Sequence, residues 1–138
     1  MEDYWNPMVP ELSVTNVADS LVFYQAIGFS VRFRRADPDF AYIELGHAQL
    51  MLEELTDSSW TTAPPKRPFG RGVNFQVEVE EVENLSRRLA NDGIKMFEDL
   101  SESWYSTDDG EEGQREFLIQ DPDGYLIRLV QPLGLRKR

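Results

Sequence analysis

The sequence of 138 residues has 14 basic and 25 acidic side chains and a net charge of -11, with three of the basic residues at the end, Arg136–Arg138. An acidic chain of this kind repels phosphate backbones and anionic lipid headgroups, so nucleic acid and membranes are excluded as main partners and cationic or neutral ones are favoured. A content of 41% hydrophobic and 12% aromatic residues is enough for a folded core.

The composition also indicates the compartment. The chain has no cysteine, so it offers no disulfide, no thiolate nucleophile and no cysteine zinc site. Residues 1–10 hold two acids and no basic segment followed by an apolar run, so we predict no signal peptide. No stretch reaches the roughly 20 apolar residues of a membrane span. We therefore expect a cytoplasmic protein.

The first half of the chain predicts a strand, a helix and three more strands. Alternating apolar residues over 11–14 indicate the first strand, and Asn16 caps a helix that Gly28 ends. Further strands are expected over 29–34, 40–45 and 49–55, with turns at Asp37–Asp39 and at Gly46-His47.

A proline-rich stretch over 60–71 separates this half from a second one of the same order. The elements predicted after it are a strand over 73–79, a helix with apolar residues at 82, 85 and 89 that Gly93 ends, a strand over 94–97, a long acidic loop, and strands over 116–119 and 125–130 joined by the turn Asp121–Gly124.

The two halves therefore form an internal repeat. The helix-ending Gly28 and Gly93 lie 65 positions apart, and the offset grows near the end because the second half carries an insertion between Ser101 and Gly113. Each half would leave one apolar sheet face, so the halves must pair or close around a cleft. We predict an α+β fold of two tandem βαβββ modules in a single domain over 1–138, with module one at about 9–56, a linker at about 57–71 and module two at about 72–133.

Several segments resemble a known family. They are Ser20–Tyr24 closing on Ile27–Phe29, Leu50–Glu53, Gln114–Phe117 and Asp121–Arg128. In this order and spacing they resemble the vicinal oxygen chelate superfamily of glyoxalases, bleomycin resistance proteins and dioxygenases, and most of all the bleomycin resistance proteins. The resemblance runs from about Val9 to Leu133. It implies curved mixed sheets that enclose a cleft, and usually a homodimer.

The resemblance also implies a choice between metal-dependent enzymes and binding proteins without a metal. Metal-dependent members place His, Gln or Glu on inward-facing strand positions. The matching positions here are Val9, Met51, Gly72 and Arg128. None is an ordinary metal ligand, and one nearby carboxylate, Glu53, does not hold a catalytic divalent ion without help. We predict no cofactor, no metal and no catalytic residue, and the single histidine, His47, is interpreted as an exposed turn residue.

Aromatic residues are the first predicted ligand contacts. By resemblance, Phe40 sits where drug-binding relatives place an aromatic that stacks on flat rings, and Tyr42 shares its strand face. Ordinary core packing is the alternative for both. A second family aromatic aligns with Glu112, which departs from the pattern and removes one side of a stacking clamp. Trp60, in the linker, is a further candidate.

The insertion is the second predicted contact region. It carries Trp104 and Tyr105, and the segment 98–112 around them has seven acids and no base: Glu98, Asp99, Glu102, Asp108, Asp109, Glu111 and Glu112. Carboxylates attract a positive charge and rings stack on a flat one, so this composition favours a cationic aromatic ligand. A solvated, mobile loop is the alternative. Either the two rings move into the cleft and replace the missing aromatic of the clamp, or they anchor the loop. In the second case they pack on the sheet or on a dimer partner.

Polar residues on the strands complete the predicted site. If Gly72 faces the cavity, then Asn74 and Gln76 do too, as Glu11 and Ser13 do with Val9. Arg128 either pairs with Glu11 or Glu53 or contacts an anionic ligand group. The predicted ligand-binding residues are Phe40, Tyr42, Trp60, Asn74, Gln76, Trp104, Tyr105, Arg115, Phe117 and Arg128.

We therefore predict a small-molecule binding protein of the bleomycin resistance type, a homodimer that sequesters a bulky cationic or aromatic compound without metal chemistry. One alternative is a metal-dependent enzyme of the same superfamily with non-standard ligands such as Glu11 and Glu53. Another is a regulatory module with a collapsed cleft, in which Trp104 and Phe40 would be buried against each other.

Overall fold

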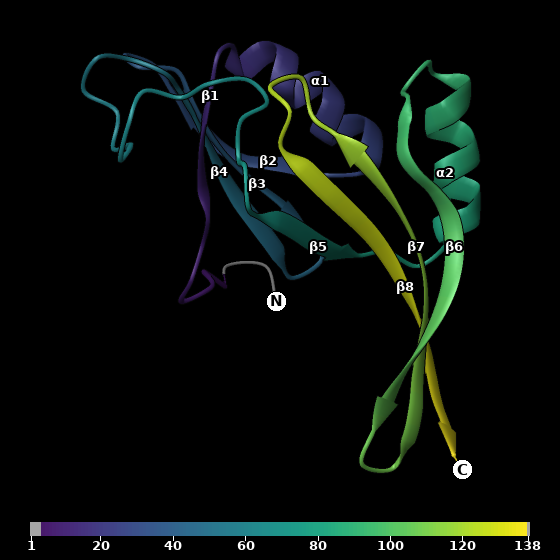
Figure 1. Ribbon diagram of the computed structural model, residues 1–138. Helices are drawn as coiled ribbons and strands as arrows, with labels where there is room; N and C mark the ends of the chain where they lie inside the picture. Colours follow the sequence, from purple (N-terminus) through teal and green to yellow (C-terminus); the bar gives the residue numbers. More distant parts are fainter. Residues whose placement is uncertain (1–3, 138) are drawn as a thin grey trace. The chain divides into compact units, whose positions relative to one another are not determined.

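The computed structural model describes residues 4–137, and the chain divides into two compact units, Met1–Arg67 and Pro68–Arg138. Each unit has the same order of one strand, one helix and three strands, and its four strands form one mixed sheet (Figure 1). The predicted α+β fold of two tandem βαβββ modules is confirmed.

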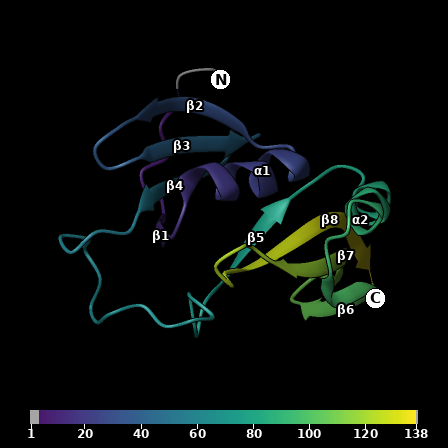
Figure 2. The same ribbon diagram turned by 90° about the horizontal axis from the view of Figure 1, so that it is seen from above.

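The first unit contains a sheet in the order β1-β4-β3-β2, with β1 parallel to β4 and the other pairs antiparallel (Figure 2). Its elements are β1 (Glu11–Val14), α1 (Val17–Ile27), β2 (Ser30–Arg35), β3 (Phe40–Leu45) and β4 (Ala48–Glu54).

Local signals set the ends of α1 as predicted. The Asn16 side chain accepts a hydrogen bond of 2.9 Å from the Asp19 backbone N–H, which satisfies one of the free donors of the first turn. Gly28 has a φ of 131° and donates its N–H to the Tyr24 carbonyl, a conformation that residues with a Cβ rarely adopt. The helix therefore ends where the glycine allows the chain to turn back.

Alternation along the strands divides this sheet into two faces. Apolar residues such as Leu12, Ile43 and Leu52 are buried, share one face and form the core with α1. The residues that alternate with these along each strand lie on the opposite face, which we call the helix-free face. Most of the first unit's candidate residues lie there.

The second unit has the corresponding sheet, in the order β5-β8-β7-β6 with β5 parallel to β8. Its elements are β5 (Asn74–Glu78), α2 (Val82–Asn91), β6 (Met96–Thr107), β7 (Gly110–Gln120) and β8 (Leu126–Lys137). The predicted turn between the last two strands is confirmed: Asp121 Oδ1 accepts the backbone N–H groups of Asp123 and Tyr125, each at 2.9 Å.

The predicted acidic loop over 98–112 is wrong. This segment forms most of β6 and the start of β7, paired as far as Thr107 and Gly110. Strand β8 continues beside β7 to Lys137 instead of ending at Val130 (Figure 1). Both faces of this ribbon carry polar side chains, so the apolar alternation that marks a strand is missing from the sequence. Cross-strand ion pairs balance part of its charge, from Arg115 to Glu102 at 3.1 Å and from Arg136 to Glu111 at 2.9 Å.

Candidate functional site

Three aromatic rings gather on the helix-free face of the first sheet. The Phe33 ring stacks beside Phe40, with ring centroids 5.6 Å apart and 28° between their planes, and beside Tyr42 at 5.7 Å and 19°. The predicted shared face of Phe40 and Tyr42 is confirmed by the pairing of these residues with Glu53 and Met51. Phe40 is only 2% exposed, whereas Phe33, which sequence reasoning missed, is 39% exposed. We call these three rings the aromatic floor.

A fourth ring stands against the aromatic floor from the N-terminal segment. The Trp5 indole meets Tyr42 edge-on, with centroids 4.7 Å apart and an interplanar angle of 80°, and lies 6.0 Å from Phe33 at 63°. The guanidinium carbon of Arg32 lies 3.6 Å from the indole centroid, a cation–π contact. Trp5 nevertheless stays 51% exposed. It precedes the first periodic element, so no pattern in the sequence assigns it to this sheet.

Hydrogen bonds hold that N-terminal segment on the sheet. The buried Gln49 side chain accepts the Asn6 backbone N–H at 2.8 Å and the Tyr42 hydroxyl at 2.6 Å, and it donates to the Tyr4 carbonyl at 2.7 Å. Arg32 also donates to the Tyr4 carbonyl. Burial raises the pKa of Tyr42, so its hydroxyl remains a donor at neutral pH. The contacts to Tyr4 and Asn6 join residues more than 25 positions apart in the sequence.

Two carboxylates lie at the end of the aromatic floor. Glu53 pairs in register with Phe40 and, through β1, with Ser13, and Glu11 shares this face. Burial and repulsion from Glu53 raise the pKa of Glu11, while nearby Arg35 opposes the shift. The Arg35 guanidinium also lies 4.1 Å from the Phe40 centroid. The face thus offers stacked rings beside two carboxylates that repel each other.

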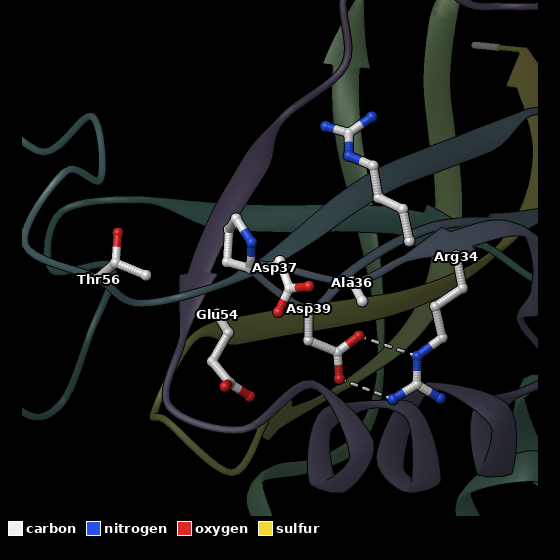
Figure 3. A pocket seen from close by; sticks show the side chains of 8 residues that line it. Arg34, Ala36, Asp37, Asp39, Glu54 and Thr56 are labelled. Carbon is white, nitrogen blue, oxygen red and sulfur yellow. Dashed lines mark hydrogen bonds and ion pairs between the residues drawn. The ribbon is translucent and has the colours of Figure 1, made fainter.

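An open hollow of about 640 Å³ lies by the turn between β2 and β3. Figure 3 shows the two hydrogen bonds of the Arg34 guanidinium to the Asp39 carboxylate, at 3.0 and 2.8 Å, among the residues that line it. This pairing raises the pKa of Arg34 and lowers that of Asp39. Glu54, which also lines the hollow, accepts the backbone N–H of Val17 at the start of α1. Arg34, Asp39 and Glu54 thus all have partners within the first unit, which is typical of a structural turn.

In the second unit, the register places Asn74, Gln76 and Arg128 on one face of the sheet, as predicted. Arg128, however, donates two hydrogen bonds to Oε1 of Glu116 on β7, at 3.1 and 2.8 Å. This partner is a neighbour in its own sheet, and the predicted pairing with Glu11 or Glu53 of the first unit stays a prediction. Glu116 lies on the neighbouring strand, diagonal to Arg128, because antiparallel pairing brings β7 beside β8.

The prediction that Arg115 and Phe117 face the binding cavity together with Arg128 is wrong. Leu118 is the register partner of Arg128, so Arg115 and Phe117 point to the opposite side of the sheet. Phe117 is fully buried there and pairs with Leu129 in the core that α2 covers. Its apolar side chain stabilises the unit by packing.

The two insertion aromatics occupy opposite faces of the β6–β7 ribbon because they are consecutive strand residues. The Trp104 indole lies on Gly113, donates to Glu102 Oε2 at 2.9 Å and has the Arg136 guanidinium carbon 4.0 Å from its centroid. It follows the second of the two predicted alternatives, anchoring its segment to the sheet. Tyr105 is half-exposed on the other face.

The remaining candidates lie at the surface of the residues that the structure describes. Trp60 is exposed in the segment after β4, and His47 is exposed in the turn before it, as predicted.

The positions that carry metal ligands in part of the resembling family do not fit a metal ion here. Met51 and Arg128 lie on the helix-free faces of their sheets, but a thioether and a guanidinium do not bind a hard divalent cation. Val9 and Gly72 have no donor side chain. Within residues 4–137, no three His, Asp or Glu side chains form a metal-binding group.

Helices α1 and α2, the two in the described part of the chain, are too short and too polar to cross a membrane.

Comparison with known proteins gives one family. The family model of the Glyoxalase/Bleomycin resistance protein/Dioxygenase superfamily matches residues 8–129. No protein with a curated description matches the chain in sequence.

Solved structures share the fold at low sequence identity. A glyoxalase/bleomycin resistance protein/dioxygenase from Alicyclobacillus acidocaldarius is 18% identical, with a TM-score of 0.63 over 94% of this chain and 92% of that one. An integron cassette protein of V. cholerae is 18% identical, with a TM-score of 0.67 over 94% and 96%. A bleomycin-binding protein in complex with bleomycin is 20% identical, with a TM-score of 0.60 over 92% and 98%.

Proposed function

Since this chain belongs to the Glyoxalase/Bleomycin resistance protein/Dioxygenase superfamily, we propose that it is one of the superfamily's small-molecule binding proteins. Its ligand is a flat aromatic compound with a positive charge, which it holds and sequesters without metal chemistry. The aromatic floor beside Glu11 and Glu53 is the observation that carries this proposal.

The chemistry of this face matches such a ligand. Phe33 is the floor ring with an open surface, and a stacked aromatic pair contributes about 0.5 to 1.5 kcal/mol beyond its buried area. Burial and the negative charge of Glu53 both raise the pKa of Glu11, so a cation bound between the two carboxylates relieves their repulsion. The net charge of -11 attracts the same class of ligand from a distance.

The residues at the family's metal positions favour binding over catalysis. A divalent ion needs several oxygen or nitrogen donors, and the four positions supply Val9, Met51, Gly72 and Arg128. The bleomycin-binding protein with the same fold provides a precedent for a binding role. We further propose that the protein acts in the cytoplasm as a homodimer and protects the cell by sequestration.

Isothermal titration tests this function with metal-free bleomycin and with proflavine, a flat tricyclic cation. We expect saturable heat with at least one of them, weakened about two- to tenfold by Phe33→Ala, since one stacked ring is lost. Glu11→Gln should also weaken binding and reduce its dependence on salt. Val22→Ala, which removes a side chain 72% exposed on α1, is the matched control and should bind like the wild type.

The absence of heat with both compounds would refute the proposed function. Equal affinities for the wild type, Phe33→Ala and Glu11→Gln would place binding elsewhere and refute the proposed site.

A further inference from the structure

We propose that Trp5 is a ligand-stacking residue, so that the N-terminal segment supplies the second aromatic surface of the site. This inference rests on the proposed function, and it assigns a role to a ring outside both repeated modules.

The Trp5 indole and the aromatic floor are inclined to each other. The three rings of the aromatic floor are within 28° of parallel where they stack, whereas Trp5 stands at 80° to Tyr42 and 63° to Phe33. The indole and the floor thus form a corner. A flat ligand ring lying along either surface meets the other edge-on, and stacked and edge-to-face contacts are the two favourable arrangements of aromatic pairs.

The Trp5 ring is open to solvent although it packs on the sheet. An indole that served only as a lid on the core would be buried, yet 51% of Trp5 is exposed, and it lies next to Phe33, the open ring of the aromatic floor. Arg32 covers the indole with its guanidinium, so part of the ring is already engaged. The exposed remainder is available to a single flat partner.

Hydrogen bonds hold the backbone in place on both sides of Trp5. The buried side-chain amide of Gln49 makes three hydrogen bonds. Two of them are with the backbone of Tyr4 and Asn6, on either side of Trp5. Arg32 adds a hydrogen bond to Tyr4, and Asn6 donates to the His47 carbonyl at 2.7 Å. A ring held in place before the ligand arrives costs less ordering entropy on binding than a mobile one.

Titration calorimetry with proflavine and with metal-free bleomycin tests the assignment. Trp5→Ala should bind about tenfold more weakly than the wild type, and Trp5→Phe should recover part of the loss because it keeps a ring. Gln49→Met keeps the length of the side chain but not its uncharged donor and acceptor, so it should weaken binding while Trp5 remains present. Met8→Ala, in the same segment and 83% exposed, is the control and should bind like the wild type. Circular dichroism confirms that each variant is folded.

The outcomes separate this inference from the function on which it rests. Binding by the wild type with unchanged affinity in Trp5→Ala would overturn the role of Trp5 and leave the proposed function intact. Tighter binding by Trp5→Ala would show that the indole covers the site, and it would overturn the inference as well. No binding by the wild type would overturn both.

Discussion

Gly113 supports the Trp104 indole, and replacing it with alanine should destabilise the protein. A Cβ placed on Gly113 would lie 2.5 Å from the indole, closer than any nonbonded carbon contact allows. Gly113 is not among the described glycines with positive φ, so its backbone accepts alanine without strain. The ring must therefore move, and the contacts that hold it must break.

The size of the effect follows from those contacts. Forcing a methyl group into this contact costs about 1 to 3 kcal/mol, as overpacking does, and it breaks the hydrogen bond of the ring to the exposed Glu102 carboxylate at 2.9 Å. It also removes the contact with Arg136, worth about 0.5 to 1 kcal/mol at an exposed position. The reduced entropy of the unfolded chain returns about 0.4 to 1 kcal/mol when glycine becomes alanine. We expect Gly113→Ala to lower the free energy of unfolding by about 1 to 2 kcal/mol.

Urea unfolding of four proteins tests this reasoning: the wild type, Gly113→Ala, Trp104→Ala and the double variant. Without the indole, nothing opposes the added methyl group, so Gly113→Ala should stabilise the Trp104→Ala background by about 0.4 to 1 kcal/mol. The effect of Gly113→Ala on the free energy of unfolding thus has opposite signs in the wild type and in the Trp104→Ala background. The same sign and size in both would refute the placement of the ring on Gly113.

Further predictions concern single carboxylates. Asp121→Ala should cost about 2 kcal/mol in urea unfolding, because two buried backbone N–H groups lose their acceptor, whereas Asp121→Asn keeps an oxygen and should cost less. The pKa of Glu11 is raised above its ordinary 4.5, so ionisation of this side chain destabilises the folded protein as the pH rises above 4.5. Glu11→Gln should therefore be more stable than the wild type at pH 7, and this advantage should disappear at pH 3. The pKa of Asp39 is lowered from its ordinary 3.8 by Arg34, so its contribution is present above pH 3.8 and is lost as the pH falls; Asp39→Asn should flatten the acid side of the stability curve, and an unchanged curve would contradict this.

Features that depend on neighbouring residues could be predicted from the sequence. The cap at Asn16, the stop at Gly28 and the turn at Asp121 each involve hydrogen bonds across five residues or fewer. Alternation along a strand likewise decides which side chains share a face, and this placed Phe40 with Tyr42. The repeat of elements then predicted the two modules.

The register between strands could not be predicted in the same way. The faces of Arg115 and Phe117 depend on which β7 residue pairs with Arg128, and a shift of one position reverses them. The partner of Arg128 depends on the same register. The ribbon over 98–112 lacks apolar alternation, and its ion pairs to Arg115 and Arg136 join residues 13 and 25 positions apart.

The sequence by itself determined the two modules and their helices, because these follow from local spacing and residue type. Only the tertiary structure decided that Trp5 stands on the aromatic floor and that the acidic insertion is a paired ribbon. The hydrogen bonds of Gln49 that fix Trp5 span more than 40 residues, and Trp5 has no periodic neighbours to indicate its face. A contact of that kind exists only after the first sheet has formed, because β4 must place Gln49 beside the N-terminal segment.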